Sequence, residues 1–200
     1  MRSASAPMRW VLIAALTTMF YVPWVSAKPN SGVGLIAGTG FTVYHTDDAT
    51  LQRRLDELDS SILALGAAAR LDFSTFGAEL NALYWHETFG DAYYDAITFP
   101  LLTRFSASVT PRLGLSLGAG LEFRIPIAAT EVIDFRTQNT VNPYQSNVYA
   151  PLSLSLDIYL PDVGMSTGIE GRYGYELTAR SKGVSSVRDD YALFLGTLLF

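Results

Sequence analysis

The chain has 200 residues and no cysteine, and its 14 Lys and Arg against 19 Asp and Glu give a formal net charge of −5. The absence of cysteine excludes a disulfide framework, a thiolate metal site and a lipidated cysteine anchor. The acidic balance argues against nucleic acid as a partner. With 16 Gly, 11 Tyr and 11 Phe, the composition favours β structure over helix.

The amino end has the features of a secretory signal peptide. Arg2 and Arg9 precede an apolar run at residues 10–21, and Val25-Ser26-Ala27 forms a small-residue cleavage site. We therefore expect residues 1–27 to be a Sec-type signal peptide that is removed on export. The alternative, a retained membrane anchor, requires a longer apolar run. Removal takes two of the 14 basic residues and no acidic residue, so the net charge becomes −7.

Residues 28–200 are expected to form one all-β domain. Apolar residues alternate with small or charged ones, as in Leu113–Ile125, where Leu, Ala, Phe and Ile occupy the odd positions. Each alternating segment has about ten residues or more, the length that a tilted strand needs to cross a bilayer. The predicted strands are about 33–45, 61–73, 77–87, 93–108, 113–127, 148–160, 163–177 and 191–200.

The connections between these strands differ in length in a regular way. Tight turns follow the second, fourth and sixth strands, whereas long polar loops at 46–60, 128–147 and 178–190 follow the first, fifth and seventh. An even number of antiparallel strands with short turns at one end and long loops at the other is typical of bacterial outer-membrane barrels. The predicted fold is therefore an eight-stranded antiparallel up-and-down transmembrane β-barrel in the outer membrane, with the lipid bilayer as its partner.

The composition of the two strand faces separates a membrane barrel from a soluble one. A soluble ligand-binding barrel places bulky residues inside and charge outside, and a membrane barrel inverts this arrangement. The predicted strands contain no Lys, and their smaller face consists of Gly, Ser, Ala and a few charges, which is a poor surface for water. The last strand ends at Phe200 on the apolar face, and we expect Phe200 to be an assembly signal. Its readers would be the barrel-assembly machinery, with periplasmic chaperones as further partners during biogenesis.

The small face predicts what the lumen contains. Charge in a narrow, low-dielectric tube is costly unless it is paired, so four basic and five acidic inward residues should form an ion-pair network that acts as a structural plug. A selectivity filter or binding site is the alternative. The residues are Arg70, Asp72, Glu79, Arg104, Glu122, Arg124, Asp157, Glu170 and Arg172. Their positions along the strands predict an upper group of Glu122, Arg124, Glu170 and Arg172 and a lower group of the other five.

An apolar patch is predicted on the inward face near the long loops. Its residues are Ile62, Leu83, Trp85, Tyr191, Leu193 and Leu195. We expect this patch to face the upper charged group across a cavity that suits a small amphipathic molecule. A slip of one residue in register would turn every one of these side chains outward, so this hypothesis depends on the register.

Few residues offer catalytic chemistry. The only histidines, His45 and His86, end the first and third strands on the lipid-facing side, close to Asp47, Asp48 and Glu87. The sequence has no His-x-Ser pattern like that of the barrel deacylases. We therefore predict a protein that is not an enzyme and has no cofactor and no metal, with a lipid-modifying barrel enzyme as the weaker alternative.

The run Ile97–Ser106, a turn and the glycine-studded strand from Leu113 resemble the outer-membrane β-barrel domain family, in which a Pro-Leu strand precedes such a strand. The strand count and apolar outer lumen are similar to the OmpW/OprG group and less closely to OmpX and the OmpA barrel. This resemblance implies a small channel or transporter for hydrophobic or amphipathic molecules, with lateral release into the membrane. A non-conducting barrel whose surface loops act as adhesin or antigen is the alternative.

Overall fold

The computed structural model describes residues 31–47, 49–55, 59–73, 75–89, 92–130, 146–178, 180–181 and 186–200. The predicted signal peptide at residues 1–27 lies outside the described residues, as does most of the predicted loop at 128–147.

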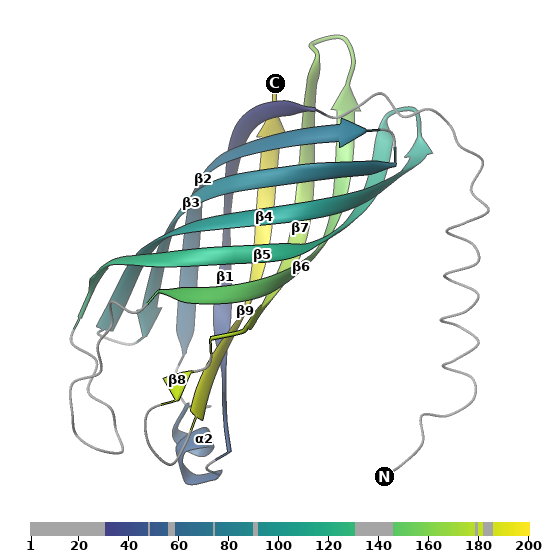
Figure 1. Cartoon of the computed structure of the whole chain (residues 1–200). Coiled ribbons are helices and arrows are strands. Elements are labelled where there is room, and N and C mark those ends of the chain that lie inside the picture. Colours follow the sequence, from purple (N-terminus) through teal and green to yellow (C-terminus); the bar gives the residue numbers. More distant parts are fainter. Residues whose placement is uncertain are drawn as a thin grey trace, which may run out of the picture.

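The described residues form a closed antiparallel barrel (Figure 1). Each long strand pairs with the next along the chain, and β1 pairs with β9 to close the ring. The predicted eight-stranded barrel is therefore confirmed. The long strands are β1 Gly32–Thr46, β2 Ser60–Phe73, β3 Phe76–Phe89, β4 Ala92–Thr110, β5 Leu113–Ala129, β6 Asn147–Leu160, β7 Met165–Glu176 and β9 Ser186–Leu199. Two short elements join them: the helix α2 Ala49–Leu55 and the strand β8 Arg180–Ser181, which pairs with β9.

The two ends of the barrel differ. Figure 1 shows α2 and β8 at the end opposite the carboxy terminus. We call this the long-loop end, and we call the other end, with the turns after β2, β4 and β6, the short-turn end. Within the described residues, no helix is long and apolar enough to cross a membrane.

The last strand begins earlier than its sequence pattern indicates. β9 starts at Ser186, five residues before the predicted start, and its pairing with β1 extends to Thr46 opposite Val187. Residues 188–190 are Arg, Asp and Asp, so apolar alternation fails there. Backbone hydrogen bonds to β1 do not depend on that alternation, which is why the strand continues through a polar stretch.

Bulky apolar side chains cover the outside of the barrel. Ile169 is 67% exposed and Leu152 61%, although both belong to long strands in the middle of a sheet. The same surface carries further exposed leucines, and exposed aromatic residues lie near both ends of the strands. Examples are Leu63, Leu65, Leu71, Leu101, Leu117, Leu121, Leu154, Tyr84, Tyr93, Tyr173, Phe73 and Phe200. A continuous exposed apolar band of this kind is stable only against another apolar phase.

Two prolines interrupt the backbone pairing inside the wall. The β3–β4 register runs to Leu80 opposite Leu101 and resumes at Leu83 opposite Thr98, with Pro100 in the gap. In the same way, Pro151 lies in a gap in the β5–β6 register. Proline has no N–H to donate, so the ladder loses bonds at both places. Both prolines are buried on the inward face.

Candidate functional site in the barrel lumen

Six charged residues form the lower network, which comprises Arg70, Glu79, Arg104, Asp157, Glu170 and Arg172. Arg104 lies at its centre: Nη1 is 2.6 Å from Glu79 Oε2 and 3.4 Å from Glu170 Oε2, and Nη2 is 3.2 Å from Asp157 Oδ2. Alternation along β2, β3, β4, β6 and β7 directs these side chains inward, so strands that are distant in sequence contribute to one cluster.

The other two arginines connect opposite walls of the ring. Arg70 on β2 contacts Glu79 on β3 at 2.9 Å and Asp157 on β6 at 3.0 Å. Arg172 on β7 contacts Glu170 at 2.7 Å and Glu79 at 3.5 Å. Three arginines therefore face three carboxylates, so their charges balance, and all six residues are at most 2% exposed. Multiple partners for each ion are what offsets the desolvation of buried charge.

Neutral polar side chains satisfy the remaining oxygens of the lower network. Asn81 Nδ2 donates to Glu79 Oε1 at 3.0 Å, and the Ser116 hydroxyl donates to Asp157 Oδ2 at 3.2 Å. Ser155 accepts from Arg104 and donates to Asp157. The lower network is thus a hydrogen-bonded plug that reaches across the barrel.

A second cluster, the aromatic chamber, lies nearer the long-loop end and surrounds one guanidinium. The guanidinium carbon of Arg124 is 3.7 Å from the ring centre of Trp85, 4.2 Å from that of Tyr149 and 5.1 Å from that of Tyr191. Arg124 Nη2 donates to Glu122 Oε1 at 3.0 Å and Nη1 donates to the Tyr149 hydroxyl at 3.1 Å. Cation–π attraction and a carboxylate therefore hold the same cation.

The rings of the aromatic chamber also contact one another. Trp85 and Tyr191 meet edge to face with centres 5.1 Å apart, and Tyr149 and Tyr191 are 5.4 Å apart. The Tyr191 hydroxyl donates to Glu122. Tyr191 can adopt this position because Gly174 lies beneath it: a Cβ there would overlap the ring. The aromatic chamber therefore depends on a glycine in the adjacent strand.

A second carboxylate borders the aromatic chamber. Glu87 accepts a hydrogen bond from Trp85 Nε1 at 3.2 Å and another from the Thr42 hydroxyl, and it is 4% exposed. The predicted apolar residues complete the surroundings, since all of them belong to one buried cluster with the aromatic rings. They are Ile62, Leu83, Trp85, Tyr191, Leu193 and Leu195.

The structure corrects two expectations about the lumen. Glu170 and Arg172 belong to the lower network and not to an upper group, because their side chains reach Arg104 and Glu79 on other strands. A prediction from position along a strand neglects both the tilt of the strands and the length of an arginine side chain. The second correction concerns the expected cavity between the apolar patch and the upper charges: Arg124 stacks directly on Trp85 and fills that position.

Two further predicted residues lie at the short-turn end. Asp72 is half-buried there, and its backbone N–H donates to the Ser31 hydroxyl at 2.9 Å. Phe200 is 57% exposed, and its backbone pairs with that of Val33. Both residues lie apart from the aromatic chamber.

Sequence reasoning missed several lumen residues that the same alternation could have found. Asn81 and Glu87 share the inward face of β3 with Glu79, and Ser155 shares that of β6 with Asp157. Tyr149 lies on the inward face of β6 as well. Attention to charged residues left out the neutral partners Asn81, Tyr149 and Ser155, and Glu87 was grouped with the histidines of the outer rim instead of with the lumen.

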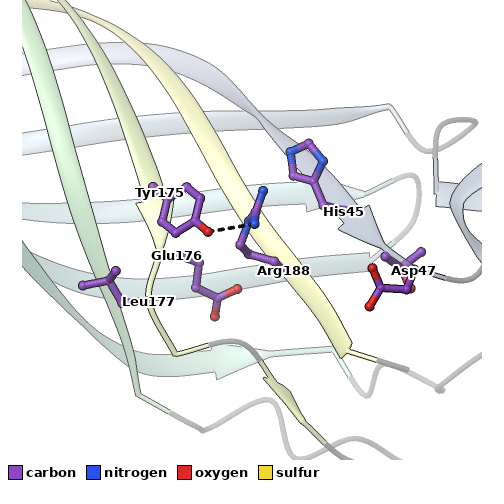
Figure 2. A pocket seen from close by; sticks show the side chains of 7 residues that line it. His45, Asp47, Tyr175, Glu176, Leu177 and Arg188 are labelled. Atoms are coloured by element: carbon purple, nitrogen blue, oxygen red, sulfur yellow. Dashed lines mark hydrogen bonds between the residues drawn. The ribbon is translucent and has the colours of Figure 1, made fainter. Parts of the chain in front are cut away.

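A small pocket lies at the rim of the long-loop end, between β1 and the β7–β9 seam (Figure 2). Its volume is about 240 Å³, and His45, Asp47, Tyr175, Glu176 and Arg188 contribute to its lining. The figure shows Arg188 pointing toward Tyr175, whose hydroxyl it binds at 2.9 Å. Charges of both signs line this pocket.

Beneath this rim, Asp190 is buried although its register position faces outward. Its carboxylate accepts from the Tyr173 hydroxyl at 2.6 Å, from Arg188 Nε at 3.0 Å and from the backbone N–H of Glu176 at 3.1 Å. Backbone pairing between β7 and β9 ends at Gly174 opposite Tyr191. Asp190 therefore joins the two strands by side-chain bonds where the ladder stops.

The two histidines occupy separate places on this outer rim. His86 Nδ1 is 2.6 Å from Asp95 Oδ1, and His45 Nε2 is 3.3 Å from Asp190 Oδ2. Among the residues that the structure describes, no group of three His, Asp or Glu side chains has the arrangement of a metal site.

No protein-family model matches the sequence, and no curated protein matches it. Solved structures do show a likeness. The crystal structure of Neisserial surface protein A superposes over 85% of this chain and 98% of its own, with a TM-score of 0.55 and 11% identity. Outer membrane protein OprG of Pseudomonas aeruginosa covers 85% and 97% with a TM-score of 0.48 and 14% identity. The amino-terminal barrel of OprF from the same organism covers 86% and 100% with a TM-score of 0.43 and 14% identity.

The likeness to Neisserial surface protein A spans nearly the whole of that chain. At 11% identity it shows a shared fold and carries no information on activity. The chain therefore has the fold of the small outer-membrane β-barrels.

Proposed function

We propose that this chain is an integral protein of the bacterial outer membrane. The support is physical: a closed ring leaves no unpaired strand edge, and its outer surface is an apolar band that water would not stabilise. The long-loop end would then face the cell exterior, and the bilayer would be the principal partner.

Within that setting, we propose a non-enzymatic barrel whose lumen is closed to passive diffusion. One observation carries this proposal: the lower network joins β2, β3, β4, β6 and β7 through ion pairs that solvent does not reach. A water-filled pore would leave such side chains exposed. The barrel would anchor its outer loops at the cell surface, where interactions with other molecules would take place.

Swelling of liposomes that contain the refolded protein tests whether the lumen is closed. Liposomes that contain the parent chain should swell in arabinose no faster than empty liposomes. The double variant E79A/R104A removes the centre of the lower network and one charge of each sign, so it should increase swelling severalfold. E176A/R188A, with one charge of each sign removed at the rim, is the matched control and should leave the liposomes closed. Porin-like swelling by the parent chain would contradict the proposal.

A second candidate function is transport of small amphipathic molecules with release through the wall. The observation in its favour is the gap in β3–β4 pairing at Pro100, which adjoins the strand that carries Leu83 and Trp85. An apolar molecule in the upper lumen would thus meet a wall with fewer backbone bonds. Uptake of such molecules by cells should fall in W85A, and unchanged uptake would argue against this candidate.

Biogenesis would involve the barrel-assembly machinery and periplasmic chaperones, with Phe200 as the assembly signal. The exposed ring of Phe200 and its pairing with Val33 at the closing seam support this role. F200A should slow folding in cells more than spontaneous refolding into detergent. Equal slowing in both would assign Phe200 a structural role instead.

A further inference from the structure

The aromatic chamber has the composition of a cation-binding site, and its occupant is part of the chain. Trp85, Tyr149 and Tyr191 surround the guanidinium of Arg124 with ring centres at 3.7–5.1 Å. Aromatic cages of this kind are a recurrent means of binding organic cations, and a planar guanidinium can stack and donate hydrogen bonds at once.

The polar groups of the aromatic chamber fit a guanidinium in particular. Glu122 Oε1 accepts from Nη2 at 3.0 Å, and the Tyr149 hydroxyl accepts from Nη1 at 3.1 Å. These acceptors are fixed by other bonds, because Tyr191 donates to the second oxygen of Glu122 and Asn147 donates to Tyr149. The site would therefore keep its shape if the cation in it were exchanged.

Arg124 has fewer carboxylate partners than the arginines below it. Its one ion pair among the described residues is with Glu122, whereas Arg70 and Arg172 each contact two carboxylates and Arg104 contacts three. With Glu87 beside Trp85, two carboxylates border the aromatic chamber and one arginine occupies it. The lower network, in contrast, has three carboxylates and three arginines. The excess of negative charge at the aromatic chamber would attract a cation.

We propose that the aromatic chamber is a binding site for small molecules that carry a guanidinium group, with Arg124 as a tethered occupant that such a molecule displaces. The position of the aromatic chamber toward the long-loop end places the site on the loop side of the lower network. The inference goes beyond membrane anchoring and does not depend on whether the barrel conducts.

Trp85 provides a reporter for this site. The chain contains two other tryptophans, Trp10 and Trp24, and both lie in the predicted signal peptide. Each variant is therefore measured with and without the additional substitution W85F. The difference between the two fluorescence signals is that of Trp85 alone, in the full chain. Methylguanidinium chloride is the probe, tetramethylammonium chloride is the comparator and sodium chloride is the control for ionic strength.

R124A empties the aromatic chamber and removes the tethered competitor. Because a tethered group acts at an effective concentration in the millimolar range, methylguanidinium should bind R124A at least about ten-fold more tightly than the parent. Saturable quenching should appear with R124A and shift to higher concentration in R124A/E122Q, which lacks the carboxylate charge. Tetramethylammonium should bind more weakly, since it cannot donate to Glu122 or Tyr149.

R124Q, which keeps much of the side chain without its charge, is the second variant. A lack of saturable quenching in whichever of the two variants folds would overturn the proposal. Equal quenching by methylguanidinium and tetramethylammonium would overturn the claim that the site selects guanidinium groups. Equal quenching by sodium chloride would overturn the claim that the aromatic chamber is a binding site at all. If neither variant folds, Arg124 is a structural strut and not a displaceable occupant, which also overturns the proposal.

Discussion

The lower network and the aromatic chamber fill the same lumen by different means. Below, three arginines and three carboxylates interlock, and Arg104 alone contacts three acids from three other strands. In the aromatic chamber, one arginine has one carboxylate and three aromatic rings. Loss of Arg104 takes a cation from three carboxylates at once, whereas loss of Arg124 takes one from Glu122 alone.

This difference indicates a division of roles within one fold. A network with balanced charge across opposite walls ties strands from both sides of the barrel together. A cluster with aromatic surfaces and a single cation can exchange that cation with less disruption to the wall. Substitutions in the two regions should therefore differ in their effect on the free energy of unfolding.

The largest effect is expected for R104M. Removal of this guanidinium leaves Glu79, Asp157 and Glu170 buried with two arginines, and loss of one partner from a buried ion pair costs about 3–5 kcal/mol. Urea unfolding in phospholipid vesicles, followed by the fluorescence of Trp85, measures the change. R112M, at the exposed turn after β4, is the control and should change little. A loss below 1 kcal/mol for R104M would show that the lower network does not stabilise the barrel.

R124M should cost less than R104M. It removes one buried ion pair and one bond to Tyr149, where R104M removes three ion pairs, so the loss should lie near the lower end of the same range of about 3–5 kcal/mol. Methionine retains contact with the aromatic rings, which limits the loss. The same urea titration gives the comparison directly. If R124M proves as destabilising as R104M, the contrast between the two regions fails, and the aromatic chamber is as rigid as the plug.

G174A tests the aromatic chamber without a change in charge. A methyl group at this position overlaps the ring of Tyr191, so that ring must shift away from Trp85 and Glu122. Overpacking of this kind costs about 1–3 kcal/mol. G171A on the same strand is the matched control, because a Cβ there meets nothing within 4 Å. Equal stability of the two variants would mean that Tyr191 does not rest on Gly174.

The strand count and the inward face followed from the sequence because they depend on a period of two. Once Leu113–Ile125 defines the apolar face, alternation assigns Glu122 and Arg124 to the lumen. The network partners did not follow, because they depend on side-chain reach across the ring. Arg172 meets Glu79 on the opposite wall, a contact that no spacing along the chain encodes.

The start of β9 and the place of Asp190 show a second limit of pattern reasoning. A polar stretch has no apolar alternation, so the pattern predicts a loop at Arg188–Asp190, although β1 pairs with these residues. Asp190 has a register position that faces outward, and its side chain is nevertheless buried by Tyr173, Arg188 and His45. Burial by neighbouring side chains at a rim cannot be derived from strand periodicity.

The smallest effect is expected for H86Q on the outer rim, and it sets the lower end of the scale on which the two lumen regions are compared. The His86 side chain is 37% exposed, binds Asp95 at 2.6 Å and stacks beside Tyr93. Exposed ion pairs contribute about 0.2–1 kcal/mol, because solvent already screens them and two side chains must be ordered. Glutamine keeps a hydrogen-bond donor for Asp95, so the urea midpoint should stay close to that of the parent chain. A loss comparable with that of R104M would show that the rim, and not the buried plug, dominates the stability of the barrel.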